Sequence, residues 1–339
     1  IFYGIMLCCA FGSLWPAGAS FVASVISVPI RYVQMVAKWM AKIPFSSVFT
    51  CSVYIVVWLA LCYGMIGAFL LLKKKKPLVL LGCVSVSLTV ALILSYVEPR
   101  LDDYRITAFD VGQGQCILIE SQGETYLVDC GGDSEKLVAD KVYQKLLSQG
   151  TTCLDGVILT HYDKDHAGAL ASVLSQIPAE TLSLPDIEPE NALRLELEGK
   201  YSSQITWIRE DTVLANENRK ISVFVPEKGA EGNESCQSIL FQIKNCDILI
   251  TGDLSAEGER AVIQRAQLPK LELLVVGHHG SATSTDFSLL EETMPKAAVI
   301  SVGKNNSYGH PASDVLVRLK LFGCDIYRTD IHGMVTFRG

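Results

Sequence analysis

Two long runs without a charged residue, at 51–72 and 77–97, set the strongest limit on how this chain can fold. At about 1.5 Å per residue, a helix of either length crosses a hydrocarbon core of roughly 30 Å. Four lysines at 73–76 separate the runs, and basic loops favour the cytoplasmic side of a membrane. The sequence therefore predicts a transmembrane hairpin with a cytoplasmic turn, and it places everything after residue 100 outside the cytoplasm.

A third span is expected at 1–28, where almost every residue is apolar or small. Residues 30–43 differ, because basic side chains recur between apolar ones at helical spacing and Trp39 lies among them. Such an amphipathic helix is suited to the membrane interface, although packing among neighbouring spans explains the pattern equally well. The chain begins within an apolar run without an initiator methionine, so we expect residues 1–100 to be the last part of a longer membrane domain.

Charge and histidine content set residues 101–339 apart from this membrane region. Of the 29 basic and 36 acidic side chains, residues 1–100 contain eight basic and one acidic, which leaves 21 basic and 35 acidic for the rest. All six histidines follow residue 160. An acidic domain repels a polyanion. A general nucleic-acid clamp is therefore disfavoured, whereas a metal-dependent nuclease stays open because bound metals offset the field.

The densest polar cluster is Thr-His-Tyr-Asp-Lys-Asp-His-Ala-Gly at 160–168. Apolar residues precede and follow it, which predicts a strand, a loop and a helix. Imidazole nitrogens and carboxylate oxygens are suitable ligands for zinc or manganese. The alternative is that Asp163 and Asp165 only cap the helix, but capping does not explain both His161 and His166. We therefore expect a metal site here.

Other polar groups also follow apolar strands within residues 101–339. They are Asp129, His161, Asp253, His278 and the loop 308–310. In layered α/β folds, reactive groups collect at the carboxyl ends of strands. Catalytic sites are commonly assembled from distant parts of a sequence in this way. The pattern predicts that these groups meet at one rim of the sheets.

The motifs resemble those of a known family. Thr-His-x-Asp-x-Asp-His-x-Gly at 160–168 resembles the metal motif of the metallo-β-lactamase superfamily. With four further motifs the chain resembles the C-terminal domain of the ComEC family of competence proteins: Phe-Asp-Val-Gly-Gln-Gly at 109–114, Thr-Gly-Asp at 251–253, His-His-Gly-Ser at 278–281 and Tyr-Gly-His-Pro at 308–311. The resemblance implies an α/β fold: a four-layer αββα metallo-β-lactamase-like hydrolase domain at 101–339, preceded by transmembrane α-helices.

The resemblance also implies a ligand set for two divalent metal ions, zinc or manganese. It divides six residues between them: His161 and Asp163 for the first ion, Asp165, His166 and His278 for the second, and Asp253 as a bridge. The family has a further histidine ligand between residues 168 and 253, and no histidine occurs there in this chain. The first site is therefore expected to be the weaker one. So many oxygen donors make manganese more plausible.

Catalytic roles follow from the same resemblance. Asp165 is expected to orient or deprotonate a water molecule. His310 and Ser281 are expected to contact phosphate or to protonate the leaving oxygen. The family's turn usually has Asp at the position of Gln115, which predicts an impaired site if that Asp orders it.

Other residues are expected to act around the reacting groups. His279, Asn305 and Tyr308 are assigned to substrate binding, although His279 fits a packing role equally well. Asp110 and Asp129 are expected to support the site.

The function implied is DNA internalisation in natural transformation, with a membrane-anchored nuclease that hydrolyses phosphodiesters of the strand not transported. Single-stranded DNA, membrane lipid and other DNA-uptake proteins are the partners expected. The location implied is the bacterial inner membrane, with several spans and the hydrolase domain on the extracytoplasmic side. Two alternatives stay open: an inert lactamase-like domain that guides DNA or gates a channel, and a membrane-tethered hydrolase of small molecules.

Overall fold

The computed structural model describes residues 6, 9, 12, 15–40, 42, 52–72, 76–98, 101–215, 219–227, 229–230 and 232–339. Contacts divide the chain into two units, Ile1–Thr50 and Cys51–Gly339. The first unit contains one long helix. The second contains a helical hairpin and two sheets with their covering helices.

The long helix of the first unit is α2 (Pro16–Met40), and its length and composition are sufficient to cross a membrane. Pro29 lies inside this helix. A proline removes one backbone hydrogen bond, yet the helix continues on both sides of it. The expected boundary between a span ending at 28 and a separate helix starting at 30 is therefore wrong. Most of residues 1–14, where the expected span begins, lie outside the described residues.

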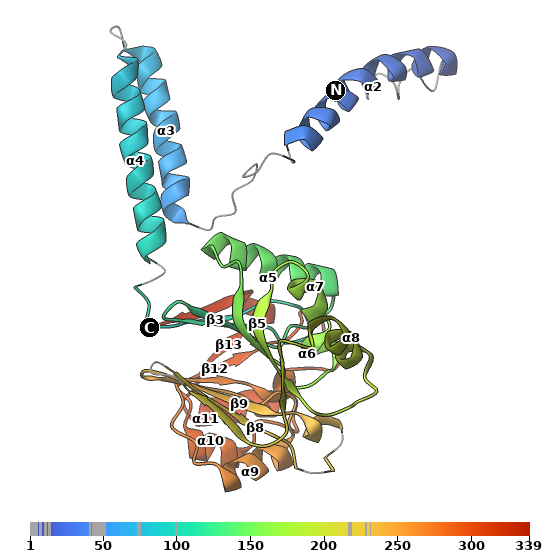
Figure 1. Ribbon diagram of the computed structural model, residues 1–339, viewed down its shortest axis with the longest axis vertical. Coiled ribbons are helices and arrows are strands. Elements are labelled where there is room, and N and C mark those ends of the chain that lie inside the picture. Colours follow the sequence, from blue (N-terminus) through green and yellow to red (C-terminus); the bar gives the residue numbers. More distant parts are fainter. Residues whose placement is uncertain are drawn as a thin grey trace. The chain divides into compact units, whose positions relative to one another are not determined.

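The hairpin of the second unit consists of α3 (Val53–Leu71) and α4 (Pro77–Val97), which lie side by side (Figure 1). Both helices are long and apolar enough to span a membrane, as the sequence predicts. Trp58 Nε1 donates a hydrogen bond to the carbonyl of Val84 at 3.4 Å. Such interhelical contacts help membrane helices associate, because lipid tails are as apolar as the helices themselves.

Two seven-stranded sheets make up the core of residues 101–339. Sheet A has the order β14-β1-β2-β3-β4-β5-β6, and sheet B has the order β13-β12-β11-β10-β9-β8-β7. The strands of sheet A are β1 (Arg105–Ala108), β2 (Ile117–Ser121), β3 (Glu124–Val128), β4 (Leu154–Ile158), β5 (Ala179–Pro185), β6 (Ile205–Ile208) and β14 (Val335–Arg338). The strands of sheet B are β7 (Thr212–Ala215), β8 (Arg219–Phe224), β9 (Ser238–Ile243), β10 (Cys246–Ile250), β11 (Leu273–Val275), β12 (Ala297–Ile300) and β13 (Asp325–Arg328).

Helices cover the outer face of each sheet (Figure 1). Those that follow strands of sheet A are α5 (Glu135–Gln149), α6 (Lys164–Ala167), α7 (Leu170–Leu174) and α8 (Ala192–Tyr201). Those that follow strands of sheet B are η2 (Gly232–Ser235), α9 (Ala256–Arg265), η3 (Gly277–Gly280), α10 (Phe287–Thr293), α11 (Ser313–Leu321) and α12 (Thr329–His332). The layers are helix, sheet, sheet, helix, which confirms the predicted αββα architecture.

Apolar side chains on both faces of the strands hold these layers together. In β2, Ile117 and Ile119 pack into the cluster between the sheets, whereas Leu118 packs against α5 and its neighbours. This alternation follows from the two-residue period of a strand, and a strand buried on both faces is apolar throughout. A third cluster joins sheet B to α9, α10 and α11.

Parallel pairing places the site loops together. Strands β3, β4 and β5 run parallel in sheet A, and β10, β11 and β12 run parallel in sheet B. The carboxyl ends of parallel strands meet at one edge of a sheet. The segments after β3 and β4 therefore lie at one edge of sheet A, and those after β10, β11 and β12 lie at one edge of sheet B. Residues that follow β4, β10 and β11 come together, so the two edges adjoin.

Candidate metal centre

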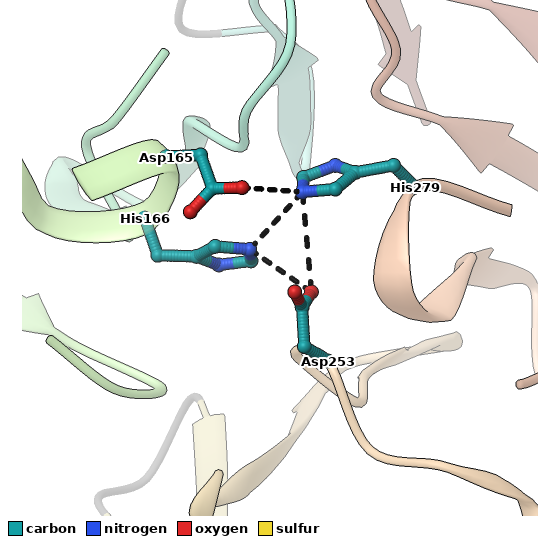
Figure 2. A group of neighbouring side chains, drawn as sticks. All are labelled: Asp165, His166, Asp253 and His279. Carbon is teal, nitrogen blue, oxygen red and sulfur yellow. Dashed lines mark hydrogen bonds and ion pairs between the residues drawn. The ribbon is translucent and has the colours of Figure 1, made fainter. Parts of the chain in front are cut away.

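Four side chains from three segments converge at this edge: Asp165, His166, Asp253 and His279 (Figure 2). We call them the inner group. One ligand atom from each lies within 4.8 Å of all the others. Asp165 and His166 come from α6 after β4, Asp253 follows β10, and His279 lies in η3 after β11.

A buried carboxylate fixes the orientation of His166. Its Nδ1 lies 2.7 Å from Asp129 Oδ2, and Asp129 also accepts hydrogen bonds from the Thr160 amide (2.7 Å), the Thr160 hydroxyl (2.8 Å) and Gln115 Nε2 (2.8 Å). Since the carboxylate only accepts, Nδ1 carries the proton. The lone pair of His166 Nε2 then points into the inner group. A carboxylate behind a histidine is the usual arrangement at a metal site.

His279 is oriented by a backbone carbonyl instead. Its Nδ1 donates to the carbonyl of Ser301 at 2.9 Å, in the segment after β12. Its Nε2 therefore faces the inner group with a lone pair, 3.3 Å from His166 Nε2 and 3.4 Å from Asp165 Oδ2. Two acceptor nitrogens at this separation repel each other unless a cation lies between them.

Asp253 completes this arrangement of acceptors. Its Oδ1 lies 3.0 Å from His166 Nε2, yet it is buried and has no hydrogen-bond partner among the described residues. Burial opposes its charge, but attraction to His166 holds the pKa of Asp253 well below its usual range. An ionised carboxylate facing two imidazole nitrogens suits a divalent cation such as zinc or manganese. The residues present therefore fit a metal ion.

The same charges act on the imidazole of His166. Burial lowers its pKa, but attraction to Asp253 and Asp129, together with the hydrogen bond to Asp129, raises that pKa well above its ordinary value overall. In the absence of a metal, a proton takes the place of the missing positive charge. The inner group therefore favours a positive charge at this position, either a metal ion or, in the metal-free chain, a proton on His166.

His161 and Asp163 form an outer pair beside the inner group. The Thr160 hydroxyl donates to Asp129, so its oxygen accepts from His161 Nδ1 at 2.9 Å. His161 Nε2 is thereby left as a buried acceptor without a hydrogen-bond partner among the described residues. Asp163 Oδ2 lies 3.7 Å from that nitrogen, on a side chain that is 63% exposed. Burial and the neighbouring His166 lower the pKa of His161 to about 4, so this ring is neutral and free to act as a ligand.

The structure differs from the predicted ligand set in one histidine. His278, expected to join Asp165 and His166, has its Nε2 3.7 Å from Asp253 Oδ2 and its Nδ1 3.2 Å from Asn233 Nδ2. His279, which was assigned to substrate binding or packing, takes the inward position that was expected for His278. Both residues have positive φ, 48° and 54°, and this left-handed turn directs the two consecutive rings to different sides.

Two glycine-rich turns, at 111–114 and 130–132, contact the backbone of the loop at 160–168, which we call the metal loop. A Cβ atom at Gly131 would overlap the backbone of Asp165 and His166, and one at Gly114 would overlap Gly132 and the Asp165 carbonyl. The Gln115 amide donates to the carbonyl of Asp165 at 2.8 Å. Only glycine permits this close approach, and Gly114 also has a φ of 152°.

The fold and the centre agree with the comparison of the sequence with known families. The model of the metallo-beta-lactamase superfamily matches residues 109–304, more than half of the chain. The chain belongs to the metallo-beta-lactamase superfamily. The crystal structure of YhfI from Bacillus subtilis, a metallo-beta-lactamase fold protein, is similar at 15% identity over 70% of this chain and 100% of that one, with a TM-score of 0.49.

Curated relatives of this chain include larger proteins whose names refer to competence and recombination. ComE operon protein 3 of Bacillus subtilis is 30% identical over 268 residues, which cover 73% of this chain and 34% of that protein. Recombination protein 2 of Haemophilus influenzae is 29% identical over 78% of this chain and 32% of its own length. The chain thus spans about one third of these ComEC-family relatives.

The remaining predicted residues of the metallo-beta-lactamase domain lie outside the inner group. His310 has its ring 5.8 Å from that of His278, and Tyr308 stacks on it at 5.8 Å and 17°. Ser281 Oγ is 3.0 Å from Thr283 Oγ1. Asp110 accepts from the Gly112 amide at 3.5 Å, within the first glycine-rich turn.

Sequence reasoning missed three contributions to the centre. Thr160 links Asp129 to His161, the Ser301 carbonyl orients His279, and Gln115 donates to Asp129. Thr160 is part of the quoted motif, and Gln115 was noted as a departure from the family, so the sequence drew attention to both residues. A backbone carbonyl leaves none, because any residue type supplies one.

Proposed function

We propose that this protein is a membrane-anchored, metal-dependent nuclease that hydrolyses DNA phosphodiesters during DNA uptake and degrades the strand that is not transported. The observation that carries the proposal is the inner group, whose Asp165 also lines an open groove together with Lys164 and Lys304. The names of the relatives, a ComE operon protein and a recombination protein, support DNA as the substrate.

The residues divide between two ions, zinc or manganese. Asp165, His166 and His279 would hold one, with His279 in the role expected of His278, and Asp253 would face both ions. His161 and Asp163 would hold the other ion with fewer protein ligands. A bound divalent ion lowers the pKa of water and polarises a phosphoryl oxygen.

The protein's own groups position and move protons around the phosphate. In the metal-free chain the close contact with His279 and the charge of His166 outweigh burial and lower the pKa of Asp165, so this carboxyl group is ionised. It is the group that accepts the proton of the attacking water. Burial and the nearby His278 lower the pKa of His310, so at neutral pH His310 donates a neutral N–H hydrogen bond to phosphate and does not act as a strong acid.

The membrane helices give this activity a location. The apolar helices α2, α3 and α4 and the competence-protein relatives indicate a membrane protein. We propose several spans in the bacterial inner membrane, with the nuclease domain on the extracytoplasmic side beside other DNA-uptake proteins. Protease added to intact cells should cleave residues 101–339. Full protection of this domain would contradict the orientation.

The activity is tested with the whole chain in detergent and a labelled single-stranded oligonucleotide. Cleavage should need added Mn²⁺ or Zn²⁺ and should be lost in Asp165→Ala and His166→Ala. His332→Ala is the matched control, because His332 is exposed and its ring contacts only the Arg328 backbone and Tyr327 among the described residues. Cleavage that persists in both ligand variants would rule out this site.

A second function is favoured by the outer pair. No histidine occurs at 167–277, and Asp163 is largely exposed, so a second ion has a poor ligand set. A domain that has lost catalysis would guide DNA or gate a channel. Metal analysis separates the two, since the nuclease should bind close to two equivalents and an inert guide need not bind any.

A further inference from the structure

A groove of about 750 Å³ opens beside the inner group. Its walls come from four separate segments: the two glycine-rich turns, the start of α6, and the loop that follows β12. Asp165 belongs both to the groove and to the inner group. Anything that lies in the groove therefore lies directly beside the candidate reaction centre.

The loop at 303–308 is held rigidly as one wall of this groove. The side-chain amide of Asn306 accepts from the His310 amide at 3.0 Å and donates to the carbonyls of Gly303 (3.0 Å) and His310 (2.8 Å). The Gly303 amide in turn donates to Gln113 Oε1 at 3.2 Å across the groove floor. The loop is thus folded before any ligand arrives, and pre-formed sites bind with less loss of entropy.

The charges of the groove differ from those of the domain around it. Lys164 and Lys304 both line the groove and are exposed, and neither forms an ion pair with any residue that the structure describes. The groove also contains Asp133, whose Oδ1 accepts from the Gln113 amide at 3.0 Å, and Asp165, which faces the inner group. Two unpaired cations in a domain with 14 more acidic than basic side chains mark a place where an anion is favoured.

An exposed aromatic ring stands at the same groove. Tyr308 is 70% exposed and is supported from one side by the stacked ring of His310. A large aromatic side chain so exposed on a rigid loop is suited to stack on an unpaired base. Bases in a duplex are already stacked on their neighbours and are not free for this contact.

We infer that this groove is a subsite for single-stranded DNA, in which Lys164 and Lys304 contact phosphates that flank the scissile one and Tyr308 stacks on an unpaired base. This inference rests on the proposed nuclease function for its choice of DNA. It assigns the two lysines to substrate affinity and Tyr308 to the preference for single strands over duplex.

Binding and cleavage are measured separately on the whole chain in detergent. Binding uses a fluorescein-labelled oligothymidylate, and the same label on a duplex, with EDTA present so that no cleavage occurs. Lys164→Ala/Lys304→Ala should weaken binding of the single strand on the order of tenfold and reduce the slope of log affinity against log salt by about 1.4, since each lost phosphate contact removes about 0.7 for single strands. In cleavage assays with metal, KM should rise while kcat changes little.

Tyr308 is tested by a matched pair of substitutions. Tyr308→Ala should weaken single-strand binding roughly fivefold or more and leave duplex binding unchanged, and Tyr308→Phe should restore it. Lys320→Ala is the control for charge, because Lys320 is exposed at the far end of α11 and has no ion pair among the described residues.

These experiments distinguish a failure of the proposed subsite from a failure of the proposed nuclease function. A chain that binds single strands through these residues but never cleaves them would overturn the proposed nuclease and keep the subsite. A chain that cleaves DNA with unchanged KM and salt slope in the double lysine variant would keep the nuclease and overturn the subsite. An equal loss in Lys320→Ala, or an equal effect of Tyr308→Ala on duplex, would also overturn it.

Discussion

The inner group and the outer pair are built from the same short motif, but the fold supports them very differently. His166 has Asp129 behind it, His279 has a backbone carbonyl behind it, and Asp253 is 5% exposed. In the outer pair only His161 is anchored, through Thr160, while Asp163 extends into solvent. A metal site depends on the groups that orient its ligands as much as on the ligands, so the inner group should bind its ion far more tightly.

The largest effect expected is from removing an inner ligand. His166→Ala takes away the nitrogen that lies 3.0 Å from Asp253 and 3.3 Å from His279. The affinity of the inner group for its ion and the cleavage rate should fall by at least about 100-fold, more than the loss of an orienting residue costs. Asp163→Ala should cost about tenfold in the same assays. Equal losses in the two variants would break the distinction between the inner group and the outer pair.

The next effect comes from the carboxylate behind the inner group. Asp129→Ala leaves His166 without its Nδ1 acceptor and Thr160 without its partner. Affinity for Mn²⁺ or Zn²⁺ should fall roughly 10- to 100-fold, as measured by competition with a chelating dye. Asp110→Ala is the control, because Asp110 contacts a surface turn and not the centre. Unchanged affinity in Asp129→Ala would show that His166 does not need Asp129 to hold its orientation.

A smaller effect is expected at Gln115, the position where the family resemblance suggested impairment. Its side chain donates to Asp129 at 2.8 Å and is buried. Gln115→Ala removes one of four donors to a buried carboxylate and should destabilise the chain by about 1.5–3 kcal/mol. Thermal unfolding with and without metal measures this cost. Gln115→Glu should be worse than Gln115→Ala, since it places a second carboxylate beside Asp129; the reverse order would contradict the hydrogen bond.

The smallest effect expected is a difference between Asp163 and Asp165 in how each contributes to the stability of the metal-free chain as the pH changes. Burial and the neighbouring Asp165 raise the pKa of Asp163. The pKa of Asp165 is lowered instead, because the close contact with His279 and the charge of His166 outweigh burial, which raises it. At pH 7 Asp163→Asn should therefore raise the unfolding temperature slightly and Asp165→Asn should lower it. The loss in Asp165→Asn should shrink as the pH falls below the unfolded value of 3.8.

These pH effects have opposite signs for a definite reason. A carboxyl group with a lowered pKa in the folded state adds stability above its unfolded pKa and loses that contribution on acidification. A raised pKa has the reverse effect, with stability lost as the pH rises. The same sign in both aspartate variants would contradict the contrast between the inner group and the outer pair.

The sequence was sufficient to predict the layers and most of the centre. Apolar strands and the polar residues that follow them identified β4, β10 and β11 as the strands that carry the site, and the uncharged runs identified α3 and α4. The resemblance named Asp165, His166 and Asp253 as ligands, and the structure brings these three side chains together. These signals are local, because each depends on residue types within one short segment.

The failures of prediction came from geometry that no short segment encodes. His278 and His279 are adjacent and chemically identical, and only the left-handed backbone of η3 decides which ring turns inward. The sequence predicted a span that ends at 28 and a separate helix that starts at 30, yet α2 continues through Pro29. The role of Gln115, which precedes β2, depends on Asp129, which follows the neighbouring strand β3.

The contact of Gly114 and Gly131 with the backbone of Asp165 limits how such a domain can diverge. A larger residue in either turn would push the metal loop away from Asp253, so that loop and both turns can change only together. In the loop at 303–308 the backbone constrains Gly303, Asn305 (φ 94°) and Asn306, while the exposed side chains of Lys304 and Tyr308 can vary one at a time. Relatives that act on different substrates should therefore differ in this loop first, while the backbone of the metal loop stays the same.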